Sequence, residues 1–73
     1  MMTFTLGPAD LAVGDFVPEF SGHVVSVTES RRPGTDELGG YLIEVAELVG
    51  SNSNWLVPTD HMITAVLSGG DTR

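Results

Sequence analysis

The chain contains no cysteine, no lysine and no glutamine, and these absences narrow its chemistry. Without cysteine there is no disulfide, no thiol nucleophile and no cysteine metal site, so apolar packing must hold the fold together. The basic residues are three arginines against ten carboxylates, which gives a net charge of −7. Proteins that bind nucleic acid directly need several basic groups on one face, so direct binding to phosphate backbones is disfavoured.

Long hydrophobic runs are also missing. No apolar run reaches the ~18 residues of a membrane span, and residues 1–6 lack the positive charge and long apolar stretch of a signal peptide. We therefore expect a soluble, cytoplasmic protein that does not contact a membrane. A length of 73 residues allows one domain with a small core. The absence of lysine and glutamine beside abundant glycine, valine and threonine suits a high-GC bacterial or phage genome.

Short runs rich in β-branched and aromatic residues fill residues 13–66, and each run ends at Gly, Pro, Asn or Ser. This pattern is typical of a small all-β barrel. The strands are expected at 3–6, 16–20, 23–28, 41–49, 55–57 and 63–67. Residues 1–67 are expected to form a single domain in which 1–12 is an N-terminal arm or an edge strand. Residues 68–73 are expected to be a disordered tail.

Two strands carry more detailed expectations. Pro18 cannot donate to a β-ladder, so the strand around it lies at a sheet edge or carries a bulge. Alternation through 23–28 predicts that Val25 and Val27 point inward and that Val24 points outward, unless a bulge shifts the register.

The connections give two further expectations. Residues 29–40 are expected to form a long loop, with Leu38 as its one apolar side chain. Thr59 or Asp60 is expected to cap a single helical turn that runs through Met62.

Four segments, taken in order, carry a resemblance to a known family: Val13-Gly14-Asp15, then 22–27, then 41–45, then 55–62. Together they resemble small bacterial Src-homology-3-like barrels, with their "V-G-D" entry, "G-x-V-V-x-V" strand and closing "W-x-x-P-x-D-x-(Leu/Met)" turn. The resemblance implies a five-stranded, strongly bent barrel with a single helical turn before the last strand. It implies no activity, because such barrels serve as platforms for peptides, nucleic acid and subunits alike.

Catalytic signatures are absent from the sequence. His23 and His61, with Asp15 or Asp60 near them in sequence, could form an acid–base pair or a metal site, but two isolated histidines match no metal-ligand spacing. There is no Gly-x-Ser-x-Gly elbow and no Gly-x-x-x-x-Gly-Lys phosphate loop. We expect no enzyme activity, no catalytic residue, no metal and no cofactor.

By elimination, the sequence favours a non-enzymatic protein–protein interaction module, which we expect to be a bacterial or phage-encoded accessory protein acting on a host protein complex. The expected partner-binding residues are an arginine pair, an apolar loop residue and two aromatic residues: Arg31, Arg32, Leu38, Tyr41 and Trp55. Core packing is the competing explanation for the two aromatic residues, since so small a barrel needs large apolar side chains.

Two alternatives remain open from the sequence. The first is an acidic mimic of DNA that inhibits a nucleic-acid-binding enzyme, because a net charge of −7 would steer basic partners. The second is a structural subunit of a homo-oligomer, such as a homodimer that pairs through an edge strand near residues 3–6.

Overall fold

The computed structural model describes residues 3–67 and shows an all-β protein. Its elements in chain order are β1 (Phe4–Leu6), η1 (Pro8–Asp10), β2 (Phe16–Val17), η2 (Pro18–Phe20), β3 (Gly22–Arg31), β4 (Leu38–Glu47), β5 (Ser53–Val57) and β6 (Ile63–Ala65). The η elements are single 3-10 turns. Within the described residues, no helix has the length and apolar character needed to cross a membrane.

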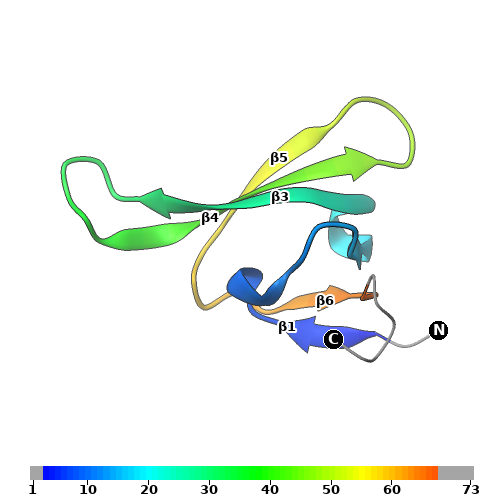
Figure 1. Cartoon of the computed structure of the whole chain (residues 1–73), viewed down its shortest axis with the longest axis horizontal. Coiled ribbons are helices and arrows are strands. Elements are labelled where there is room, and N and C mark those ends of the chain that lie inside the picture. Colours follow the sequence, from blue (N-terminus) through cyan, green and yellow to red (C-terminus); the bar gives the residue numbers. More distant parts are fainter. Residues whose placement is uncertain (1–2, 68–73) are drawn as a thin grey trace.

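The strands form two antiparallel sheets (Figure 1). β2, β3, β4 and β5 pair in that order into one strongly curled sheet with the shape of half a barrel. β1 and β6 form a second, small sheet, which two backbone hydrogen bonds between Phe16 and Val66, of 2.9 and 2.8 Å, join to β2. Along the order β1-β6-β2-β3-β4-β5, the outer strands of the described structure are therefore β1 and β5.

The core lies between the two sheets, because both contribute its buried side chains. These are Leu11, Val17, Phe20, Val24, Ile43, Val45, Val57, Ile63 and Ala65. Ile43 and Val45 have no exposed surface, as expected for one face of a central strand. Alternation along β4 places Leu42 on the opposite face, where it is 42% exposed.

A β-bulge in β3 reverses one expectation of the sequence pattern. Val24 is buried and pairs with Val45, whereas Val25 is 39% exposed. The register shifts between Val24 and Ser26, so an extra residue sits on β3 and turns Val25 outward. The prediction that Val25 points inward was wrong, and that for Val27 was correct, since it is half-buried and packs on the core.

The expected strand over 16–20 is much shorter in the structure. β2 ends at Val17, and Pro18 begins the 3-10 turn η2. Ser21 then adopts a left-handed conformation with φ of 56°, which turns the chain into β3. This turn buries Phe20, whereas Phe16 lies on β2.

Two connections also differ from expectation. β3 extends to Arg31 and β4 begins at Leu38, so the connecting loop covers residues 32–37 instead of 29–40. The connection before β6 is a turn in which the His61 N–H donates to the Pro58 carbonyl over 3.2 Å, and it is not the expected helical turn. The tail predicted for 68–73 lies outside the described residues.

Asp15 organises the turn that leads into β2. Its side chain is fully buried, and its Oδ2 accepts a hydrogen bond of 2.9 Å from the Ala12 N–H. The Val24 N–H donates to the Asp15 carbonyl, and the Gly14 N–H donates to the Val24 carbonyl, both over 2.8 Å. Gly14 has a φ of 98°, which favours glycine. The Val-Gly-Asp segment is thus a structural turn tied to β3.

We predict that Asp15→Ala lowers the free energy of unfolding by about 1–3 kcal/mol, because the Ala12 N–H loses its acceptor. Asp15→Asn should cost less, since its amide oxygen can accept the same bond. Urea unfolding of both variants measures the difference. Equal losses in the two variants would contradict the assigned role of the acceptor oxygen.

Candidate functional site

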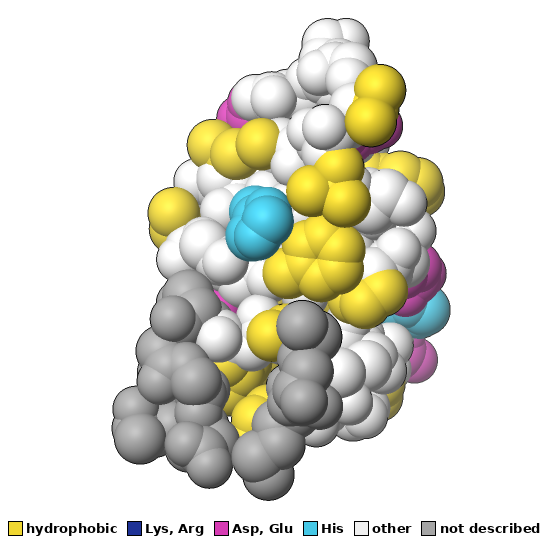
Figure 2. All heavy atoms as spheres, turned by 90° about the vertical axis from the view of Figure 1, so that its right-hand side faces the viewer, with side chains coloured by type: hydrophobic (Ala, Val, Ile, Leu, Met, Phe, Trp, Pro, Cys, Tyr) yellow, Lys and Arg dark blue, Asp and Glu magenta, His cyan; other side chains and the backbone are white. Residues whose placement is uncertain are grey.

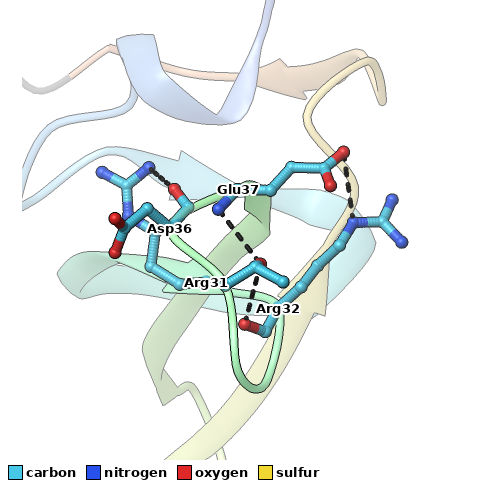
Figure 3. A network of polar contacts seen from close by, with 5 residues as sticks. Arg31, Arg32, Asp36 and Glu37 are labelled. Atoms are coloured by element: carbon cyan, nitrogen blue, oxygen red, sulfur yellow. Dashed lines mark hydrogen bonds and ion pairs between the residues drawn. The ribbon is translucent and has the colours of Figure 1, made fainter.

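The loop at the tip of the β3–β4 hairpin is closed by its own hydrogen bonds (Figure 3). The Arg32 N–H donates to the Glu37 carbonyl over 2.9 Å, and the Thr35 N–H and hydroxyl both donate to the Arg32 carbonyl over 3.1 Å. The Glu37 N–H donates to the Thr35 hydroxyl oxygen over 3.1 Å. Gly34, with a φ of 78°, supplies the left-handed residue of the turn. These bonds define the path of residues 32–37.

Both arginines expected to bind a partner are engaged within this hairpin. The Arg31 guanidinium forms an ion pair with Glu29 and donates to the Asp36 carbonyl over 3.2 Å. Arg32 Nε lies 3.6 Å from Glu37 Oε1. These side chains are about half exposed or more, and exposed pairs contribute only about 0–1 kcal/mol, so a partner could displace them. Even so, each charge is offset locally by a carboxylate.

The two aromatic residues expected to bind a partner both face the inner side of the curled sheet. Tyr41 pairs with Val57 across β4 and β5, is half-buried and packs against the core. Trp55 pairs with Ile43, stays 39% exposed and stacks on Phe20, with ring centroids 4.6 Å apart and planes 15° apart. Tyr41 therefore packs as part of the core, whereas Trp55 contacts the core through Phe20 and is also exposed to solvent.

The five expected binding residues do not form one surface. Arg31 pairs with Leu38 at the far end of the hairpin, whereas Trp55 pairs with Ile43. Leu38 and Ile43 are five positions apart on β4, which corresponds to about 17 Å of extended strand. The structure brings Arg31, Arg32 and Leu38 together and places Trp55 elsewhere.

A shallow hollow of about 180 Å³ lies beside Trp55. Its lining residues are Glu19, Phe20, Trp55, Leu56, Val57, Pro58 and His61. We call it the Trp55 hollow. It joins η2 to the end of β5 and the turn that follows, and its floor is mostly apolar. At its rim, His61 Nε2 lies 3.5 Å from Glu19 Oε2. The sequence analysis missed Phe20 and Glu19 here, because both were placed on a strand instead of on η2.

The strand beside this hollow, β5, is paired on one side only within the described residues. A Cβ added to Gly40 of β4 would lie 2.5 Å from the Val57 carbonyl oxygen, so this oxygen faces β4. Backbone groups alternate in direction along an antiparallel strand. Those of Trp55 therefore also face β4, whereas the N–H and C=O groups of Asn54 and Leu56 face the open side.

Few side chains on β5 protect this open edge. Natural edge strands are commonly blocked by charged residues, prolines or bulges. β5 reads Ser-Asn-Trp-Leu-Val and contains none of these, and Pro58 follows only after its last residue. Leu56 is 67% exposed on the outer face of the sheet, opposite Leu42. The edge is therefore open to a further strand.

The end of the molecule that faces right in Figure 1 is shown in Figure 2. Hydrophobic side chains gather in the middle of this face beside a histidine, and acidic side chains lie toward its margins. Among the described residues in view there is no basic side chain. Both described arginines lie instead in the hairpin of Figure 3.

The histidines take separate positions. The His23 ring packs against Phe16, with ring centroids 5.1 Å apart, whereas His61 lies beside Glu19. In residues 3–67, no three side chains of the metal-binding types come together in a group that could hold an ion.

In comparisons with known proteins, no family model, no curated protein and no solved structure matches this chain. The class that can be stated is therefore structural: an all-β protein with a curled four-stranded sheet, a second two-stranded sheet and an unprotected outer strand.

Proposed function

We propose that this chain is a non-enzymatic protein-binding module whose partner adds an extended segment to β5. The open edge of β5 is the observation that carries the proposal. Outward N–H and C=O groups on Asn54 and Leu56 would supply main-chain hydrogen bonds, and the Trp55 hollow would select among side chains. Strand addition to an exposed sheet edge is a recurring mode of peptide recognition.

This proposal moves the binding surface away from the hairpin tip. Arg31 and Arg32 already have carboxylate partners there, and the tip lies far along β4 from Trp55. Of the residues singled out from the sequence, Trp55 stays in the proposed surface. Leu56, Phe20 and Glu19 join it.

The proposal also includes the kind of barrel and the biological setting. The strongly curled four-stranded sheet supports a Src-homology-3-like barrel. The residue usage described above supports a bacterial or phage-encoded accessory protein that acts in the cytoplasm on a host protein complex. Strand addition at β5 depends neither on the kind of barrel nor on the biological setting.

Asn54→Pro tests the proposal. Proline removes the outward-facing N–H of residue 54 and costs no bond to β4, and prolines are tolerated on edge strands. Asn54→Ala is the matched control, because it removes the same side chain and keeps the N–H. We expect wild type and Asn54→Ala to retain the same protein from a bacterial lysate at about 0.1 M salt, and Asn54→Pro to lose it.

The circular dichroism spectra and unfolding midpoints of the three proteins are compared first, so that loss of binding is not loss of fold. Retention of the same partner by folded Asn54→Pro would contradict strand addition. Failure of the wild type to retain any protein above the Asn54→Pro background would contradict the binding function itself.

A second candidate is the acidic mimic of DNA. It is favoured by the net charge of −7, since the two described arginines are each already paired with a carboxylate. For a mimic, duplex DNA should displace the partner, and raising the salt from about 0.1 to 1 M should release it, because the Debye length falls from ~10 to ~3 Å. A partner that resists both treatments excludes this candidate.

A further inference from the structure

We propose that the segment bound at β5 is basic: it places an apolar side chain in the Trp55 hollow and a lysine or arginine against Glu19. This inference rests on the proposed function and adds the chemistry of the partner. It follows from the lining of the hollow, the charges at its rim and the geometry of an added strand.

The floor of the hollow fits an apolar side chain. Phe20 is buried, and its ring lies under Trp55 in a stacked pair, so both rings are held in place by each other. Pro58 adds a rigid apolar wall. A side chain that fills this preformed hollow removes apolar surface from water, which favours binding. An aromatic or branched aliphatic residue of the segment suits it.

The rim of the hollow fits a cation. The Glu19 carboxylate is 52% exposed, and its charged neighbour at the hollow is His61, which is charged only when protonated. Asp60 lies in the same turn as His61 and adds negative charge to this end of β5. Neither described arginine lines this hollow; Arg31 and Arg32 line a separate hollow of about 260 Å³ together with Leu56.

Strand geometry sets the spacing between the two side chains. Successive residues of an added strand point to opposite faces of the sheet, so residues two apart lie on the same face, about 7 Å from each other. The Trp55 hollow and Glu19 belong to one site on the inner side of β5. The apolar residue and the basic residue are therefore expected two positions apart in the segment.

A second copy of this chain fits the edge poorly. Every copy carries a net charge of −7 and no lysine. Pairing of two β5 strands would bring together two chains that each carry a net charge of −7, which opposes association. A basic segment removes this repulsion and adds attraction.

The experiment uses a phage-displayed library of random heptapeptides, selected on the full-length protein at about 0.1 M salt and pH 8, above the range in which imidazoles ordinarily titrate. Three targets are compared: wild type, Glu19→Gln and Asp36→Asn. Asp36→Asn is the matched control, because it removes one negative charge in the hairpin loop, outside the residues that line the Trp55 hollow. Enriched peptides are then synthesised, and their affinities are measured for the three targets and for Asn54→Pro.

We expect enriched peptides to carry a lysine or arginine two positions from a large apolar residue. Glu19→Gln should weaken these peptides about two- to fivefold, the range of an exposed ion pair, whereas Asp36→Asn should leave them within about 1.5-fold. Asn54→Pro should abolish binding of all of them.

Three results would overturn the inference. Peptides that lose affinity with Asn54→Pro but lack the basic residue would remove the proposed chemistry and leave strand addition standing. Peptides indifferent to Asn54→Pro, or no enrichment at all, would remove the proposed function as well. Sedimentation velocity that finds a wild-type dimer, dissociated by Asn54→Pro, would make a second copy the occupant.

Discussion

Ile43→Ala is expected to lower the free energy of unfolding by about 2–5 kcal/mol, the range for truncating a large buried aliphatic side chain. Ile43 has no exposed surface and sits at the middle of β4, between β3 and β5. Domains of this kind are stable by only about 5–15 kcal/mol, and small ones tend to the low end. The variant should therefore unfold at a clearly lower urea concentration and temperature than the wild type, as measured by urea and thermal denaturation.

Leu42→Ala is the control for this prediction. Leu42 is the preceding residue of β4 and lies on the opposite face, 42% exposed. Its truncation should cost about 1 kcal/mol or less, because much of the side chain already contacts water. If Leu42→Ala destabilised the protein as much as Ile43→Ala, the core would not lie on the face assigned here.

Gly22→Ala is expected to destabilise the protein by about 3 kcal/mol, the upper end of the usual range for overpacking. A Cβ on Gly22 would lie 2.3 Å from the Ala46 carbonyl oxygen and 2.6 Å from Val45 Cγ1. The first of these atoms is backbone of the neighbouring strand, so β3 and β4 would have to separate locally. Urea unfolding and amide exchange along β3 measure the effect.

Gly7→Ala provides the comparison for this substitution. The nearest atom to its added Cβ is an Asp10 carboxylate oxygen at 3.9 Å, and its φ of −73° suits any residue. The free energy of unfolding should stay within about 0.5 kcal/mol of wild type or rise slightly. A similar loss for Gly7→Ala and Gly22→Ala would show that strand contact is not the cause.

The strands could be predicted from the sequence where one face of the strand is buried and the other is exposed to solvent. On β4, strong period-2 alternation in the sequence agrees with the burial of Ile43 and Val45 on one face. β3 was predicted one position out of register at Val25, since a bulge depends on how two strands fit together and leaves no local signal. For a similar reason η2 was missed: Pro18 is compatible with an edge strand and with the start of a 3-10 turn.

The candidate site was less predictable than the strands. Trp55 stood out as a large amphipathic residue, but its stack on Phe20 and the proximity of His61 to Glu19 depend on η2 folding back beside β5. The arginine pair was conspicuous in sequence, yet Glu29 and Glu37 from the same hairpin engage both side chains. The openness of β5 is a property of sheet order, which a single strand's sequence does not contain.

If β5 binds a strand of a partner, its edge must stay open to that partner and still avoid pairing with other chains. An uncharged, unblocked edge invites pairing with unintended chains, and the acidic surface limits such pairing by repelling other acidic proteins and copies of this one. Negative charge would then serve both solubility and partner choice. The same surface supports the preference for a basic segment.

Amide hydrogen exchange at single-residue resolution tests the central claim most directly. In the free protein, the Trp55 and Val57 amides should exchange slowly because they face β4, and the Asn54 and Leu56 amides should exchange fast because they face the open edge. Addition of a bound heptapeptide or captured partner should slow exchange at Asn54 and Leu56. Protection confined to the hairpin loop 32–37, with Asn54 and Leu56 unchanged, would contradict binding at β5.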